Sequence, residues 1–288
     1  SKNMVETSYL KQNFKSSHYH SVRPTYPRSL FQAIMSYHKV GRELVLDVGC
    51  GTGKATFPMT EYFDTVIGVD PSSKMLEIAR REKEMLGKRQ VEFTCISGEA
   101  LSDSFEPKSV DMVVAAESIH WCNRDKLYKQ VAQVLKPGGT FAFWFYVQPL
   151  FVDHPEAQRV YYKYGWSEEY MGRYLDEDRK RFLLEYGGAE LVKTLEGNFA
   201  SVERHVYDPT VSEYRERTAF HLKKSFTLKE FRDYVYSWSL YASWVSDHPG
   251  EDDIADKFIK ELREVCNCDE MTELRVEWST FYCLCTAQ

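Results

Sequence analysis

The chain has 288 residues, enough for one large domain or for a core with an elaborated cap, and its formal charge at pH 7 is -6. An acidic chain with a pI near 5.8 lacks the basic footprint of a nucleic-acid-binding protein, so we expect no nucleic-acid partner. No apolar run approaches the ~18 residues of a membrane span, and no secretory pattern opens the chain, so we expect a cytoplasmic protein without a membrane partner.

Strand and helix patterns alternate through the first half of the chain, which is typical of a parallel sheet with helices on both faces. We therefore predict an α/β fold with a doubly wound, mostly parallel, Rossmann-like sheet. The expected strands are 44–47, 66–70, 91–96, 110–116 and 140–146. Helices are expected after Pro71 and from about Asp125, and Pro58 should delay or kink the helix that follows the first strand.

The second half of the chain has fewer strand patterns. Strands are expected at 201–207 and 275–285, and a weak helix at 254–265. Between the two strands, Thr227 and Glu230 form a capping box that begins a helix. Apolar side chains then recur at helical spacing from Phe231 to Val245, either as core packing or as an aromatic lid over a substrate pocket.

The segment 44–53 indicates a nucleotide-binding loop. An apolar strand leads into Asp47 and the alternating glycines Gly49, Gly51 and Gly53, which is how a βαβ nucleotide-binding unit begins. Gly53 comes one residue too early for the dinucleotide fingerprint, and the P-loop positions hold other residues. A glycine-rich turn without a ligand is the alternative interpretation.

Two acids indicate which nucleotide binds. Asp47 at the mouth of the strand would repel a pyrophosphate on the helix N-terminus and suits a cation. The common adenine nucleoside that carries positive groups and no phosphate is S-adenosylmethionine, so this is the cofactor that we predict. Asp70, nineteen residues after Gly51, is spaced to accept hydrogen bonds from the ribose hydroxyls.

Seven cysteines, an odd number, indicate reduced intracellular thiols. Four of them form two C-x-C pairs, Cys266 with Cys268 and Cys283 with Cys285. A four-thiolate zinc site is the alternative interpretation of these pairs. The spacing is unusual for zinc and the second pair lies in an expected strand, so we expect no metal.

The motifs together resemble the class I S-adenosylmethionine-dependent methyltransferases of the ubiquinone/menaquinone type. The resemblance rests on 44–53, 66–70, 97–100 and 135–139, the last being the turn before the fifth strand. It implies a seven-stranded sheet whose last two strands form an antiparallel hairpin. It also implies that Glu99 and Ala100 lie near the adenine.

Segments 19–27, 117–121 and 220–227 are similar to the fungal trans-aconitate methyltransferases, which esterify one carboxylate of a small polycarboxylic acid. This resemblance implies a single methyltransferase domain over 1–288. Its expected parts are an N-terminal arm and helix over the cofactor (1–40), a cofactor-binding core (41–146), and helical cap elements with the last two strands (147–288). Tyr19 of the arm is expected to close over the cofactor.

Ligands of such a sheet bind outside the carboxyl ends of the strands, so Asp47, Asp70, Glu99 and the segment 117–121 should gather there. Glu117 is expected to contact the cofactor. An ionised carboxylate acceptor needs no general base, whereas a phenol or a carbon acid does. Two residues of this segment and one of the fifth strand are candidates for substrate contact: His120, Trp121 and Tyr146. His120 and Tyr146 are also the candidate catalytic residues.

Each of these candidates has an alternative role. His120 can orient a carboxylic acid, serve as a base, or merely tie down its loop. Trp121 can stack on the cofactor or fill the loop core. Tyr146 is expected to reach the ligand because it lies at the carboxyl end of its strand.

A polycarboxylate substrate requires a cation in its site, because burying unpaired charge is costly and guanidinium matches carboxylate. Arg23 is the first candidate, with a surface arginine as the alternative, and Lys223 and Lys224 are weaker ones. The expected function is an O-methyltransferase that forms a monomethyl ester of a small polycarboxylic acid such as trans-aconitate, as a monomer or weak dimer. The alternatives are C- or O-methylation of a larger apolar acceptor, quinol or sterol-like, and a non-catalytic binding scaffold.

Overall fold

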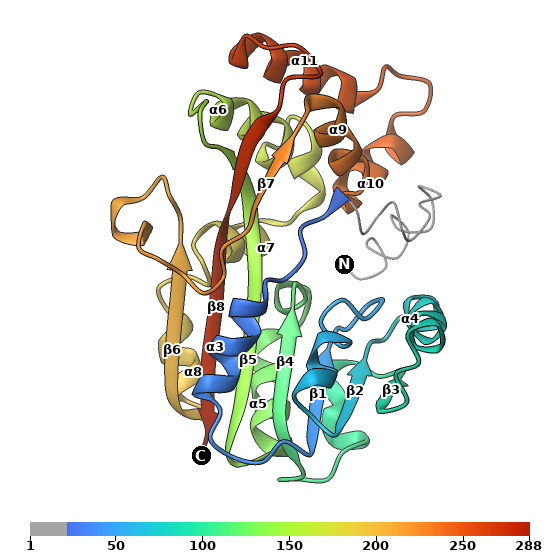
Figure 1. Cartoon of the computed structure of the whole chain (residues 1–288), viewed down its shortest axis with the longest axis vertical. Coiled ribbons are helices and arrows are strands. Elements are labelled where there is room, and N and C mark those ends of the chain that lie inside the picture. The colour runs from blue at the N-terminus through green and yellow to red at the C-terminus, as the bar shows by residue number, and fades with distance from the viewer. Residues whose placement is uncertain (1–21) are drawn as a thin grey trace. The chain divides into compact units, whose positions relative to one another are not determined.

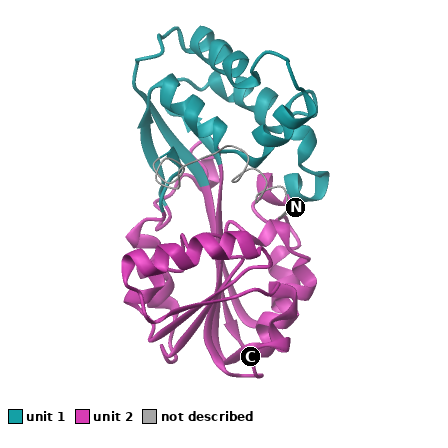
Figure 2. Cartoon of the chain, turned by 90° about the vertical axis from the view of Figure 1, so that its right-hand side faces the viewer, with its two compact units in different colours: residues 1–25, 148–181, 221–279 teal, residues 26–147, 182–220, 280–288 magenta. Residues whose placement is uncertain are grey.

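The computed structural model describes residues 22–288, which form two compact units (Figure 2). The described part of unit 1 comprises 22–25, 148–181 and 221–279, and unit 2 comprises 26–147, 182–220 and 280–288. The chain thus passes between the units several times. None of the helices within 22–288 combines the length and the hydrophobicity that crossing a bilayer requires.

The central sheet has the strand order β3-β2-β1-β4-β5-β8-β6 (Figure 1). Its strands are β1 (Leu44–Val48), β2 (Thr65–Val69), β3 (Val91–Thr94), β4 (Val110–Ala116), β5 (Leu135–Phe151), β6 (Phe199–Tyr207) and β8 (Leu274–Ala287). Strands β1 to β5 pair in parallel, and β6 pairs with β8 in antiparallel register. The predicted Rossmann-like sheet with C-terminal antiparallel strands is therefore confirmed.

Helices cover both faces of the sheet in unit 2, and the alternation of side chains along β5 shows why. Trp144 packs edge-on against Phe31 of α3 (Arg28–Tyr37), with ring centroids 5.9 Å apart. Phe143, one residue earlier, faces Tyr128 of α5 (Arg124–Val134) at 6.5 Å. Because successive side chains point to opposite faces, each helix has an apolar surface to cover.

The remaining helical elements are distributed over both units. Unit 2 has η1 (Pro58–Glu61), α4 (Ser73–Leu86), η2 (Gly98–Asp103), η3 (Ile119–Trp121), α8 (Leu191–Glu196) and η6 (Ser212–Tyr214). Unit 1 has α6 (Ala157–Tyr161), the π-helical turn η4 (Tyr162–Trp166), η5 (Met171–Tyr174), α9 (Leu228–Tyr236), α10 (Ser239–Asp247) and α11 (Ile254–Cys266). Helix α7 (Glu177–Leu184) includes residues of both units.

Three sequence expectations about the sheet were wrong in detail. The segment 135–139 is not a separate turn, because Leu135 already pairs with Val110 and a bulge absorbs the Pro-Gly residues. Strand β5 continues to Phe151, so Tyr146 does not end it, although it lies just beyond the last residue that pairs with β4, Trp144. An eighth strand, β7 (Lys223–Phe226), pairs with β8 and was not expected.

The aromatic stripe from Phe231 to Val245 was predicted as one helix, and that prediction was wrong. The capping box of Thr227 and Glu230 is present and begins α9, with Phe226 against Phe231 at 5.9 Å as the hydrophobic staple. Helix α9 ends at Tyr236, and α10 begins after Trp238, whose backbone is extended. The ring of Trp238 packs edge-on against Tyr234 and Phe231 of α9 at the point where the two helices separate.

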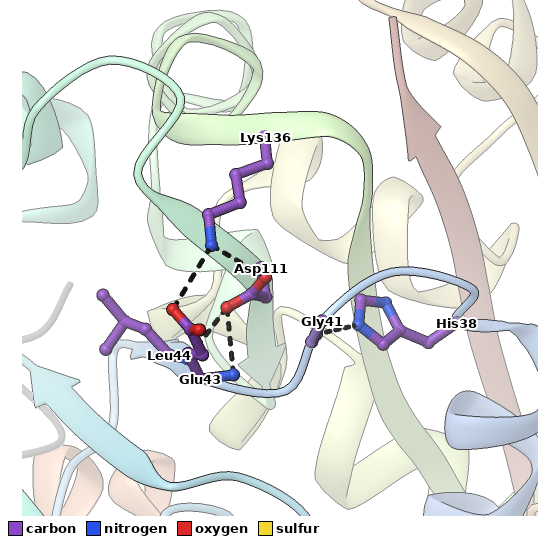
Figure 3. A network of polar contacts seen from close by, with 6 residues as sticks. All are labelled: His38, Gly41, Glu43, Leu44, Asp111 and Lys136. Carbon is purple, nitrogen blue, oxygen red and sulfur yellow. Dashed lines mark hydrogen bonds and ion pairs between the residues drawn. The ribbon is translucent and has the colours of Figure 1, made fainter.

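Asp111 anchors the amino end of β1 (Figure 3). Its buried carboxylate accepts hydrogen bonds from the backbone N–H groups of Glu43 and Leu44, at 3.1 and 2.9 Å. Lys136 lies 3.1 Å from the other carboxylate oxygen. These contacts tie β1, β4 and the start of β5 together and compensate a charge that would be costly to bury alone.

His38 lies beside this network and is buried (Figure 3). Its Nε2 donates to the carbonyl of Gly41 at 2.7 Å, and its Nδ1 lies 2.8 Å from the hydroxyl of Thr140. A neutral imidazole satisfies both contacts by accepting the hydroxyl proton at Nδ1. Burial lowers the pKa of His38 below its ordinary value of 6.5, against a smaller raising effect of the Gly41 carbonyl.

This shift predicts a loss of stability on acidification. Below pH 6.5 the unfolded chain binds a proton at His38 that the folded chain does not, so the free energy of unfolding should fall by up to about 1.4 kcal/mol per pH unit. Urea unfolding at pH 7.5, 6.5 and 5.5 should show a smaller fall for His38→Gln than for the wild type. The control His205→Gln, at a partly exposed position, should keep the wild-type slope. Parallel slopes for His38→Gln and wild type would contradict the assignment.

Candidate functional site

Four acids follow or end neighbouring strands of unit 2. Asp47 lies in β1, Asp70 follows β2, Glu99 begins the turn η2 after β3, and Glu117 follows β4. Because these strands run parallel and adjacent, their carboxyl ends form one edge. The structure therefore brings these four sequence-predicted residues to the same edge of unit 2.

The carboxylate of Asp70 organises the glycine loop. One oxygen accepts the N–H of Gly51 at 3.0 Å and the other accepts the N–H of Ser72 at 2.9 Å. Ser72 in turn caps α4 by accepting the N–H of Met75. Asp70 is buried, and its two bonds fix both the loop after β1 and the start of α4.

The glycines of the loop have backbone conformations that few other residues adopt. Gly49, Gly51 and Gly53 all have positive φ, at 66°, 55° and 101°. Among residues 22–288, a Cβ on Gly51 would have no heavy atom within 4 Å, whereas one on Gly53 would clash with Phe57 at 2.4 Å. Within this part of the chain, open space thus lies beside Gly51, where a ligand can approach the backbone.

The expected helix after this loop does not form. Turns lead from Gly51 to η1, and the bond from Phe57 N–H to the Gly53 carbonyl, 3.1 Å, closes a single helical turn. Pro58 then begins η1, as its missing N–H allows at a first position. Within the same segment, the buried hydroxyl of Thr56 donates to Asp47 Oδ2 at 2.7 Å.

Glu99 connects two neighbouring segments at the edge. Its Oε2 accepts the hydroxyl of Ser97 at 3.1 Å, and its Oε1 accepts the N–H of Asn123 at 2.8 Å. Asn123 is the N-cap of α5, so Glu99 links the turn η2 to the start of that helix. Ala100 beside it departs from helical geometry, with φ at -132°, and both residues are half-buried.

Glu117 has a strained backbone. Its φ of 55° lies in the left-handed region, which costs a side-chain-bearing residue roughly 1–3 kcal/mol and is frequent at functional sites. Its carboxylate accepts the N–H of Tyr146 at 2.6 Å, and its own N–H donates to the carbonyl of Trp144 at 2.9 Å. The residue therefore joins the end of β4 to β5.

His120 and Trp121 follow in the turn η3. His120 is buried, with its ring centroid 4.9 Å from that of Trp121 and 6.5 Å from that of Phe145. Ser118 fixes this loop by donating its hydroxyl to the carbonyl of Val48 at 2.9 Å. The loop is thus tied to the end of β1, and Trp121 remains half-buried.

Sequence reasoning missed Lys54. Its ammonium lies 4.6 Å from the ring centroid of Tyr26 and 5.5 Å from that of Tyr146. The signal in the sequence was its place directly after Gly53, at the end of the glycine loop. Tyr146 is thereby joined to the glycine loop as well as to Glu117.

The other predicted cations belong to unit 1. Arg23 donates to the carbonyl of Ser237, the C-cap of α9, at 3.1 Å. Lys224 lies 4.9 Å from the ring of Phe226, and burial lowers its pKa, while Lys223 is exposed. The predicted residue Tyr19 lies outside the described residues.

The cysteine pairs have separate environments. Cys283 and Cys285 are buried in β8 with sulfurs 4.0 Å apart, and burial raises the pKa of Cys266 to about 12. In the part of the chain that the structure describes, no three His, Cys, Asp or Glu side chains gather closely enough to hold a metal ion. The four-thiolate alternative therefore has no support there.

The carboxylates of the edge suit a cationic nucleoside. Carboxylates can accept hydrogen bonds from ribose hydroxyls and from an ammonium group, because each carboxylate oxygen has more than one lone pair. The open space beside Gly51 allows such a ligand to approach the loop. Fold and edge together define a nucleoside-binding protein of the Rossmann-like class whose ligand carries positive charge.

Comparison with known proteins agrees with this class. Residues 46–143 match a family model described as a methyltransferase domain. The chain is similar to CRG1 of Saccharomyces cerevisiae, named a probable S-adenosylmethionine-dependent methyltransferase, with 51% identity over 98% of this chain and 99% of that protein. It is also 30% identical to methyltransferase pgmE of Aspergillus terreus over 53% of this chain and 47% of that protein.

Solved structures share the fold. A protein of Anaeromyxobacter dehalogenans, named as a type II methyltransferase, superposes with a TM-score of 0.66 over 92% of this chain and 97% of its own, at 24% identity. The chain belongs to the S-adenosylmethionine-dependent methyltransferases. S-adenosylmethionine is accordingly its cofactor, as predicted from the loop.

Removing the Asp70 carboxylate should weaken cofactor binding. Asp70→Ala removes the acceptor that fixes Gly51 and any bond to the ribose. Because hydrogen bonds to charged groups contribute about 1.5–3 kcal/mol, we expect the Kd for S-adenosylhomocysteine to rise about tenfold or more in calorimetric titration. Asp64→Ala, at an exposed position, is the control and should bind as the wild type does. An unchanged Kd for Asp70→Ala would remove Asp70 from the site.

Proposed function

We propose that this methyltransferase transfers a methyl group to a carboxylate oxygen of a small polycarboxylic acid such as trans-aconitate and forms a monomethyl ester. The observation that carries the proposal is the 2.6 Å hydrogen bond from Tyr146 N–H to Glu117. This bond engages the Glu117 carboxylate with the backbone of β5, so we assign Glu117 a structural role rather than that of a base. A carboxylic acid acceptor is already ionised at neutral pH and needs no general base.

We propose that residues at the carboxyl edge of unit 2 bind the cofactor. Asp47 would balance the positive charge of the methionine portion, and Asp70 would accept the ribose hydroxyls. Glu99 and Ala100 would lie beside the adenine. The loop glycines Gly49, Gly51 and Gly53 would allow close approach of the backbone, and Glu117 and Tyr19 would complete the contacts.

The reaction requires position more than proton transfer. When bound, S-adenosylmethionine supplies an already activated methyl group. The protein's part is to hold the acceptor oxygen about 3–3.5 Å from that group, in line, and to exclude water. His120, Trp121 and Tyr146 would orient the acceptor at the end of β4 and β5, and the rings around His120 would keep its surroundings apolar.

We further infer a small-molecule partner and a monomer or weak dimer in the cytoplasm. The net charge of -6 gives no basic surface for nucleic acid. Free cysteines in both units are consistent with a reducing compartment.

The nature of the product tests the proposal. The protein is incubated with methyl-labelled cofactor and a panel of polycarboxylic acids, quinols and sterols, and the products are treated with mild base. We expect label in the acids, released by base, because esters hydrolyse and aryl ethers or C-methyl groups do not. Base-stable label in a quinol or sterol would instead establish the larger apolar acceptor.

Arg23 provides a second test. If Arg23 pairs with a substrate carboxylate, Arg23→Ala should raise the KM for the acid about tenfold or more, with the Kd of S-adenosylhomocysteine unchanged. Arg28→Ala is the control, because Arg28 makes only an exposed ion pair with Glu61. An unchanged KM would remove Arg23 from the substrate site and leave it a structural role, such as its contact to Ser237 at the end of α9.

A further inference from the structure

The carboxyl edge of unit 2 is rich in carboxylates, which disfavours the binding of an anionic substrate. Asp47, Asp70, Glu99 and Glu117 all lie along it. Carboxylates favour a cationic cofactor but repel an anionic acceptor, and a buried anion without a partner is costly. A substrate carboxylate therefore needs a cation on the acceptor's side of the edge.

Lys54 supplies a cation in unit 2. It follows Gly53 in the loop after β1, and its side chain extends to β5, where the ammonium lies 5.5 Å from the ring of Tyr146. The ring of Tyr26, 4.6 Å away, lies on a second side. The half-buried ammonium thus contacts the faces of two aromatic rings.

The strand order shows on which side of the edge this ammonium lies. Three of the four acids expected at the cofactor, Asp47, Asp70 and Glu99, lie in or follow β1, β2 and β3, which form one half of the parallel sheet. Tyr146 belongs to β5, which is separated from β1 by β4. The side chain of Lys54 therefore extends from the glycine loop toward a side chain of β5, and its ammonium lies 5.5 Å from the ring of Tyr146.

The acceptor is expected near the same side chain, that of Tyr146. Glu117, His120 and Trp121 follow β4, and Glu117 binds the backbone of Tyr146 itself. The ammonium of Lys54 and the carboxylate of Glu117 therefore share Tyr146, itself a candidate for substrate contact, as a common neighbour. Tyr26 also packs edge-on against Trp144 at 5.6 Å, which fixes the second ring relative to β5.

We propose that Lys54 binds a carboxylate of the acceptor and makes the enzyme selective for anionic substrates. This inference rests on the proposed esterification and adds the residue that recognises the acid. The carboxylate bound by Lys54 is one that does not react, because an ammonium bond would reduce the nucleophilicity of the reacting oxygen. The preferred substrate class is therefore a di- or tricarboxylic acid.

The test compares Lys54→Met with the wild type on two substrates. One is a polycarboxylic acid, such as trans-aconitate, and the other is its analogue with one non-reacting carboxylate converted to a carboxamide. For the wild type, kcat/KM should fall about 10- to 100-fold from acid to amide. For Lys54→Met, kcat/KM with the acid should fall by a similar factor, and acid and amide should then be nearly equivalent.

Three controls separate this role from others. Lys54→Arg keeps the charge and should retain most of the preference for the acid, and Lys74→Met, exposed on α4, should behave as the wild type. The Kd of S-adenosylhomocysteine should stay within about twofold in Lys54→Met. Thermal unfolding checks that the variant is folded, and Lys54→Gln replaces it if it is not.

Each contrary outcome has a distinct meaning. If the wild type forms base-labile ester and Lys54→Met retains the preference for the acid, the role of Lys54 is overturned while the proposed function stands. If the Kd of S-adenosylhomocysteine rises in step with the loss of activity, Lys54 binds the cofactor's own carboxylate instead. If the wild type methylates no acid, both proposals fail.

Discussion

The carboxylate of Asp70 is the constraint on which the cofactor edge depends. Its two oxygens hold Gly51 of the loop after β1 and Ser72 at the start of α4, so one side chain fixes two neighbouring segments. The loop could not donate this bond from Gly51 in the same way without its positive φ angles. Charge-assisted bonds to backbone N–H groups are strong and directional, which gives the edge its shape before any ligand arrives.

Much of the fold followed from local patterns in the sequence. The strand 110–116 was predicted with its observed bounds, and β1, β2 and β6 were predicted within about two residues. These strands are predictable because continuous or alternating apolar side chains reflect their burial. The capping box at Thr227 was equally visible, since it involves residues only three positions apart.

Features that depend on distant residues were not predictable in this way. Trp238 fits the apolar period of one helix, yet its ring is packed among others where α9 and α10 separate. Strand β7 has a polar sequence and forms only because β8 lies beside it. The place of Lys54 depends on Tyr26 and Tyr146, which are far from it in the sequence, so only the folded chain shows its role at the edge.

The position of β8 in the sheet has a consequence for how the protein is made. It lies between β5 and β6 although it is translated after every other described strand. During synthesis, the unpaired backbone edges of β5 and β6 therefore emerge from the ribosome before the strand that pairs with them exists. Such long-range pairing slows folding and leaves intermediates prone to aggregation. Cells that make this enzyme should depend on chaperones until β8 is inserted.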